Sequence, residues 1–161
     1  MNNPHPPTII TVSTVVEVPI DHAFDVFTQR FDDVKPREHT LLESPIEKSV
    51  LEPHLGGAVY DVAIDDSTCT WGRVIAFDPP HSLTISWNIT PQWKLESDPD
   101  KASEVEIRFA SETPTRTRVE IEHKHLDRHG EGWNTFTNLE KENGWPLYLQ
   151  RFATTAKSQI A

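Results

Sequence analysis

The chain has 161 residues, of which 36% are hydrophobic and 25% are charged, and its formal net charge is −10. These values are typical of one globular domain that is large enough to bury a core. No apolar stretch approaches the roughly 20 residues that cross a bilayer, so membrane insertion is not expected. An acidic chain without a basic block is also a poor match for nucleic acid or for an anionic membrane surface.

The N-terminal composition and the cysteine content indicate where the folded domain begins and in which compartment the protein is expected. Residues 1–8 are rich in Asn, Pro and His and lack a basic segment followed by an apolar one, which predicts a disordered lead rather than a signal peptide. A single folded domain is therefore expected over residues 9–161. The only cysteine is Cys69, so an intrachain disulfide is ruled out and a cytoplasmic location is favoured.

The first regular elements are predicted to be a strand and a short helix. β-Branched residues recur among polar ones over Ile9–Val18, which predicts a strand with one buried face, and Pro19 ends it. Asp21 is predicted to be the N-cap of the helix that follows. One face of this helix is indicated by aromatic residues at helical spacing, namely Phe24, Phe27 and Phe31.

The middle of the chain alternates apolar and polar residues with a period of two, which predicts a meander of about six antiparallel strands. These strands are expected over residues 46–51, 58–64, 68–77 and 82–90, around 105–109 and around 119–125. The phase around Trp71 is open. One choice turns Trp71 and Arg73 inward, and the other turns Gly72 and Val74 inward. The charged loop 94–101 is predicted to be an exposed hairpin tip.

The C-terminal segment is predicted to form two helical pieces. Trp133, Phe136 and Leu139 indicate a first piece, and Asn143-Gly144 is expected to be its C-cap. Pro146 suits the first turn of a second piece, where its missing N–H costs nothing. The apolar face of that piece consists of Trp145, Leu149, Phe152 and Ala156. Strands with one apolar face need helices against that face, so the expected fold class is α+β.

Several motifs in this order resemble the Bet v 1-like (START-like, SRPBCC) superfamily, and in particular its branch named after the activator of Hsp90 ATPase. The motifs are Val16-Glu17-Val18-Pro19, Leu55-Gly56-Gly57, Gly72-Arg73-Val74, Asp78-Pro79-Pro80, Leu83 to Trp87, and Gly144-Trp145-Pro146. The resemblance implies a helix-grip fold. In this fold a curved antiparallel sheet of about six to seven strands surrounds a C-terminal helix, with a short helix after the first strand. It also implies an apolar cavity between the sheet and the terminal helix.

The candidate ligand-binding residues are those expected to point into that cavity. Tryptophan combines a large apolar surface with an N–H that can orient a flat ligand, although for any single one of these residues plain core packing is the favoured explanation. Two histidines spaced two apart on the last strand are expected to share the inner face, where a neutral imidazole could hydrogen-bond a ligand. The candidate set is Trp71, Trp87, Phe109, His123, His125, Trp145, Leu149 and Phe152.

The sequence offers no recognisable catalytic or metal signature. There is no His-Glu-x-x-His, no paired cysteine, no glycine-rich phosphate loop and no Gly-x-Ser-x-Gly. We therefore assign no catalytic residue, metal or cofactor. Cys69 is expected to be a small apolar core residue.

Three functions remain open from the sequence. The first is binding of a small apolar or aromatic molecule in the cavity. The second is a cyclase, dehydratase or hydrolase that uses the same cavity, with His123 and His125 as its titratable pair. The third is a protein-interaction module acting on an Hsp90-type chaperone. This partner is not favoured, because the eukaryotic co-chaperone carries an additional N-terminal domain for which this chain has no room. A homodimer is compatible with the sequence.

Overall fold

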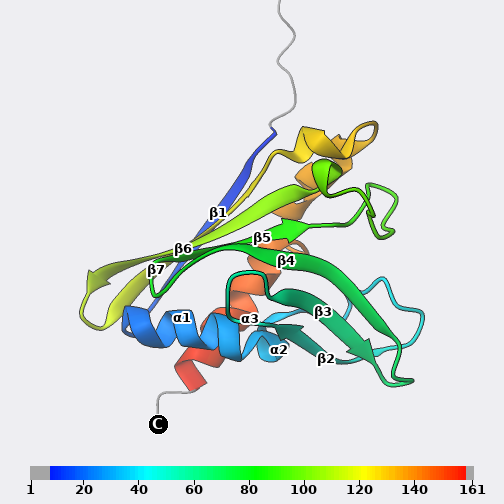
Figure 1. Ribbon diagram of the computed structural model, residues 1–161. Coiled ribbons are helices and arrows are strands. Elements are labelled where there is room, and N and C mark those ends of the chain that lie inside the picture. The colour runs from blue at the N-terminus through cyan, green and yellow to red at the C-terminus, as the bar shows by residue number, and fades with distance from the viewer. Residues whose placement is uncertain (1–7, 159–161) are drawn as a thin grey trace, which may run out of the picture.

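The computed structural model describes residues 8–158 and consists of one seven-stranded antiparallel sheet curved around a C-terminal helix (Figure 1). The elements in chain order are β1 (Ile10–Val16), α1 (Ile20–Gln29), α2 (Phe31–Val34), β2 (Ile46–Leu51), β3 (Ala58–Ala63), β4 (Thr68–Asp78), β5 (Ser82–Trp87), η1 (Pro99–Lys101), β6 (Ser103–Thr113), β7 (Arg116–Lys124), η2 (Leu126–His129), η3 (Trp133–Glu140) and α3 (Trp145–Ser158). The predicted α+β helix-grip fold is confirmed.

The sheet follows the order β1-β7-β6-β5-β4-β3-β2, so every neighbour pair except β1–β7 is a sequential hairpin. The pairing register of neighbouring strands brings buried apolar residues together on the inner face of the sheet. Ile107 lies opposite Ile121 on one side and Leu83 on the other, and all three side chains are buried. Alternate residues point to opposite faces of a strand, so this row of apolar side chains fixes which face carries the helices.

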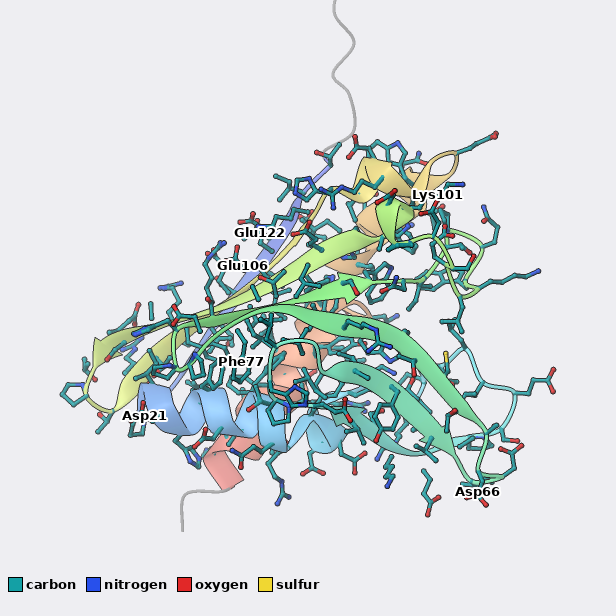
Figure 2. The ribbon with its side chains drawn as sticks, in the orientation of Figure 1. Asp21, Asp66, Phe77, Lys101, Glu106 and Glu122 are labelled. Atoms are coloured by element: carbon teal, nitrogen blue, oxygen red, sulfur yellow. The ribbon has the colours of Figure 1, made fainter. Side chains whose placement is uncertain are left out.

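The outer face of the same strands is polar. Figure 2 shows Glu106 and Glu122 there, on the neighbouring strands β6 and β7. Arg108 hydrogen-bonds to both of these carboxylates and to Glu120. Because Glu122 faces outward, the adjacent His123 must face the helices, as the sequence predicts.

The core nearest α1 is built from interlocking phenylalanines. Phe24 meets the ring of Phe109 at a centroid distance of 5.2 Å, and Phe27 meets that of Phe152 at 5.6 Å, both edge-to-face. Such pairs contribute about 0.5–1.5 kcal/mol beyond the area they bury. The helix face predicted from the Phe24, Phe27 and Phe31 spacing therefore packs against both the sheet and α3, although the chain breaks into α1 and α2 after Gln29.

Some local predictions are wrong at helix and strand ends. Asp21 is not the N-cap, because α1 already begins at Ile20 and Pro19, with its extended backbone, occupies the cap position. Asp21 lies in the first turn instead, where its charge still favours the helix dipole. β5 ends at Trp87, two residues before an isolated bridge between Ile89 and Leu95.

The first C-terminal piece, η3, is a 3-10 helix, and the spacing of three between Trp133, Phe136 and Leu139 matches its repeat. It ends at Glu140 with Lys141 as its C-cap, so Asn143-Gly144 is not its C-cap. Gly144 has a different role there. A Cβ at this position would lie 2.1 Å from the carbonyl oxygen of Leu139, so the close approach of η3 to α3 requires a residue without a side chain.

The open phase around Trp71 is resolved by an irregularity in the pairing of β3 with β4. The register shifts between the pair that contains Gly72 and the pair that contains Thr70. Trp71 and Val74 are therefore both buried, whereas Arg73 is exposed. Cys69 is buried, as expected for a core residue. Apart from Thr8, the predicted N-terminal lead lies outside the described residues.

Candidate functional site

A cavity of about 380 Å³ lies between the sheet and α3, and β3, β4 and β5 contribute its sheet side. Its remaining walls come from the segment after α2, the loop after β5, η3 and the first turn of α3. Most of its surface is apolar, and the Trp and Tyr side chains that line it are Trp71, Trp87, Trp93, Trp145 and Tyr148. A cavity of this size and character is suited to a small, flat, mostly apolar molecule.

The aromatic wall is a continuous series of ring contacts. Trp87 meets Trp71 at 5.6 Å and Trp145 at 5.5 Å between centroids, and Trp145 meets Tyr148 at 4.6 Å. The indole nitrogens of Trp71 and Trp87 are buried without a hydrogen-bond partner among the described residues. Trp93 lies in the loop after β5 and is 47% exposed, so it stands at the mouth of the cavity.

One end of the cavity is polar and is built around a buried ion pair. The Nζ of Lys35 lies 3.0 Å from Oδ2 of Asp61, and the two side chains are only 4% and 2% exposed. Ser49 Oγ donates to the other carboxylate oxygen at 2.7 Å, and the Lys35 ammonium also donates to the carbonyl of His39 at 2.5 Å. Burial lowers the pKa of Lys35, and the neighbouring Asp61 charge opposes that shift.

Two further titratable side chains face this end. The rings of His39 and Tyr148 lie 5.6 Å apart, one on the segment after α2 and the other on α3. Burial, and then the nearby Lys35 charge, lower the pKa of His39, so its imidazole is neutral at pH 7. Burial also raises the pKa of Tyr148, with the Asp61 charge adding to the effect, so its hydroxyl keeps its proton. The site therefore offers an ammonium, a neutral base and a phenolic donor.

Behind the aromatic wall, a chain of hydrogen bonds holds Trp145 in place. Its Nε1–H donates to Nδ1 of His123 at 3.1 Å, and Ser103 Oγ lies 2.7 Å from Nε2 of both His123 and His129. Since the indole can only donate, His123 accepts at Nδ1 and carries its proton on Nε2. Ser103 then accepts from His123 and donates to His129, which leaves the His129 proton on Nδ1. That nitrogen has no partner among the described residues.

Both histidines of this chain of hydrogen bonds, His123 and His129, are neutral. Burial lowers the pKa of His123 to about 3, and His129 adds a smaller effect of the same sign. Burial lowers the pKa of His129 to about 4, although Glu96 opposes the shift. Because neither imidazole lines the cavity, these residues can position Trp145 but do not contact a ligand held there.

Only some of the predicted ligand-binding residues reach the cavity. Trp71, Trp87 and Trp145 line it. The other apolar candidates are buried in the core away from the cavity, namely Phe109, Leu149 and Phe152. His123 lies behind Trp145. The expectation that His125 shares the inner face is wrong, because β7 ends at Lys124 and His125 adopts a left-handed conformation (φ 62°) that turns it to solvent.

The polar residues of the cavity were missed by the sequence analysis. For Asp61 a signal was present, since it shares the inward face of β3 with Val59 and Ala63, and a carboxylate in such a row needs a buried partner. The sequence around Lys35 and His39 did not indicate that they line a cavity. Both residues follow the end of α2 and lie outside any helical or strand repeat. Among residues 8–158, no group of three His, Cys, Asp or Glu side chains is arranged to hold a metal ion.

The curved sheet, the gripping helix and the cavity between them define a helix-grip protein of the Bet v 1-like class. Comparison with known families agrees. The sequence model of the family described as "Activator of Hsp90 ATPase homolog 1-like protein" matches residues 17–157, and the chain belongs to this family. No curated protein matches the chain. Within the described part of the chain, no helix is long and apolar enough to cross a membrane.

Several solved structures are similar over nearly the whole chain. An anthrahydroquino-γ-pyrone synthase, Txn09, is 37% identical with a TM-score of 0.64, covering 95% of this chain and 99% of that one. The self-sacrificing resistance protein CalC of Micromonospora echinospora is 26% identical with a TM-score of 0.67, covering 95% and 96%. Protein MLL2253 of Mesorhizobium loti, at 16% identity, TM-score 0.65 and coverage of 95% and 99%, shows the fold alone.

Proposed function

We propose that this protein binds a flat aromatic small molecule in the cavity between its sheet and α3. The observation that carries the proposal is the aromatic wall. Tryptophans from β4, β5 and α3, together with Tyr148, surround a space of about 380 Å³. Fused aromatic rings would contact these side chains in the stacked and edge-to-face arrangements that aromatic groups prefer.

The comparison with Txn09 indicates which aromatic molecules to consider first. The name of that synthase contains an anthrahydroquinone, which is a system of three fused carbon rings with two hydroxyl groups on the central ring, and the two chains are 37% identical. A ligand of this kind would place its rings against Trp87 and Trp145. Its oxygens would then be available to the polar end at Lys35 and Asp61.

Isothermal titration calorimetry with 1,2-dihydroxyanthraquinone tests this proposal. Leu41 lines the cavity, and replacing it with tryptophan should fill part of the space and weaken binding by about tenfold or more. Leu55→Trp is the matched control, because Leu55 is 68% exposed and does not line the cavity. Equal affinities in the two variants, or no binding by the wild-type protein, would contradict the proposal.

A second candidate is a cyclase-type enzyme that acts on a ligand in the same cavity. It is favoured by the meeting of Lys35, His39 and Tyr148, whose pKa values are all shifted, at one end of the cavity, because clusters of such titratable groups are typical of active sites. In such an enzyme, neutral His39 would accept the proton that leaves the carbon beside a ligand carbonyl. The carbonyl would become an enolate that accepts hydrogen bonds from the protein.

This second candidate can be tested without the natural substrate. Exchange of the acidic carbon-bound protons of 2-tetralone for deuterium, followed by proton NMR, measures enolisation directly. The wild-type protein should accelerate the exchange, and His39→Gln should abolish the acceleration. His54→Gln, on an exposed histidine outside the cavity, serves as control. Exchange at the buffer rate in the wild-type protein would leave binding as the function.

The family name refers to activation of an ATPase, but the cavity gives no reason to expect that activity here. The expectation that an Hsp90-type chaperone is not the partner stays a prediction, as do the cytoplasmic location and the open question of a homodimer. An ATPase assay of an Hsp90-type chaperone with and without this protein tests the first of these. Clear stimulation would favour the protein-interaction function.

A further inference from the structure

We propose that Lys35 and Tyr148 form an oxyanion site, which holds the ionised phenol or enolate oxygen of the aromatic ligand. This inference rests on the proposed function and narrows it. The ligand is not any flat aromatic molecule but one that carries an acidic O–H, either a phenol or an enolised ketone. Three features of the polar end lead to this assignment.

The first feature is an unused donor on Lys35. An ammonium group has three N–H bonds. One is directed to Asp61 and one to the carbonyl oxygen of His39. The third has no hydrogen-bond partner among the described residues, although the ring of Trp71 lies 5.4 Å from Nζ. Since Lys35 lines the cavity, a ligand oxygen can supply the missing acceptor.

The second feature is the hydroxyl of Tyr148. This residue is 3% exposed and lines the cavity, yet its hydroxyl has no hydrogen-bond partner within residues 8–158. The phenolic O–H of a largely buried tyrosine normally finds an acceptor, and this one belongs to a residue that lines the cavity, so it is suited to a ligand oxygen. Tyr148 comes from α3 and Lys35 follows α2. The Tyr148 ring lies 5.6 Å from that of His39, whose carbonyl accepts from Lys35, so the two donors approach the same end of the cavity from different elements.

The third feature is the state of the neighbouring charges. Asp61 already accepts from Ser49 and Lys35, one on each carboxylate oxygen, so the carboxylate is satisfied before any ligand enters. Glu38, at the edge of the cavity, is paired with Arg151. His39 is neutral. The ligand oxygen is therefore stabilised by two directed hydrogen bonds, one of them charge-assisted, rather than by a net positive cavity.

The ionisation of a bound dye measures this stabilisation. 1,2-Dihydroxyanthraquinone changes colour when a phenol group loses its proton, so absorbance against pH gives the ionisation constant of the bound dye. In Tyr148→Phe, which removes one oxygen atom and keeps the ring, the bound dye should ionise about tenfold less readily than in the wild-type protein. Tyr60→Phe is the matched control, because Tyr60 does not line the cavity, and it should leave the constant unchanged.

A second variant tests Lys35 without leaving a buried charge behind. Lys35→Met combined with Asp61→Asn keeps the net charge of the pair at zero but removes the ammonium donor, so the bound dye should again ionise about tenfold less readily. Binding with the same ionisation constant in the wild-type protein and in both variants would overturn the oxyanion site while leaving the proposed function intact. Failure of the wild-type protein to bind the dye would contradict both.

Discussion

Lys35 and Asp61 form an ion pair across the polar end of the cavity, with Nζ 3.0 Å from Oδ2 and both side chains almost completely buried. They are 26 residues apart in sequence and come from opposite walls, the segment after α2 and the strand β3. A buried charge without its partner is costly. The pair therefore ties the helical side of the cavity to the sheet and makes both residues sensitive to substitution.

We expect Lys35→Met to lower the free energy of unfolding by about 3–5 kcal/mol, because Asp61 is then left buried without its counter-ion. The double variant Lys35→Met with Asp61→Asn should recover most of this loss, since no charge remains in the core. Urea unfolding of the three proteins measures both effects. A single variant as stable as the wild-type protein would show that the pair does not hold the two walls together.

The histidines behind Trp145 should make the fold sensitive to acid. Their ordinary pKa is 6.5, and burial lowers it to about 3 for His123 and about 4 for His129 in the folded protein. The unfolded chain therefore binds more protons as the pH falls below 6.5. The contribution of these two histidines to the free energy of unfolding is fully present above that pH. It decreases as the pH falls to about 4, by up to about 1.4 kcal/mol per pH unit for each histidine.

Urea midpoints measured from pH 7 to pH 4 check this pH dependence. His129→Gln should flatten the profile, because one of the two groups no longer titrates. His54→Gln, on an exposed histidine, should leave the profile as it is in the wild-type protein. A slope that is identical in all three proteins would assign the acid sensitivity to carboxylates rather than to this buried cluster.

Ser103 hydrogen-bonds to both histidines, so its substitution should disrupt the series of hydrogen bonds that positions Trp145. Ser103→Ala removes the partner of both Nε2 atoms in a fully buried environment, so we expect a loss of about 1–3 kcal/mol in unfolding free energy. Ser111→Ala is the control, because Ser111 is exposed and bonds only to the nearby Thr113 carbonyl. Its effect should stay within about 0.5 kcal/mol. Equal losses in the two variants would mean that these buried hydrogen bonds contribute nothing measurable to the free energy of unfolding.

Gly144 should tolerate no side chain, because a Cβ would overlap the carbonyl of Leu139. We expect Gly144→Ala to lower the unfolding free energy by about 1–3 kcal/mol as η3 and α3 are forced apart. Since Leu139, Gly144 and Trp145 all line the cavity, the affinity for 1,2-dihydroxyanthraquinone should fall as well. Thr154→Ala, on the exposed side of α3, is the control for both measurements. An unchanged affinity would place the dye away from this wall.

The regular elements of this protein follow from local patterns in the sequence. Period-two alternation predicts most of the strands, because a strand that packs on one face must alternate. The spacing of Trp145, Leu149, Phe152 and Ala156 predicts the buried face of α3, because one helix face must cover the sheet. These features depend on residues that are near one another in the chain.

The polar site was decided by the tertiary structure alone. Lys35 meets Asp61 only because the segment after α2 lies against β3, and His39 meets Tyr148 only because α3 returns beneath the sheet after 109 further residues. Two backbone irregularities also escaped the pattern. The register shift beside Trp71 changes the parity of β4, and the left-handed conformation of His125 turns it out of the sheet. Periodicity carries no information about long-range pairing or about single residues that break a strand, so the sequence predicts the fold but not the chemistry inside the cavity.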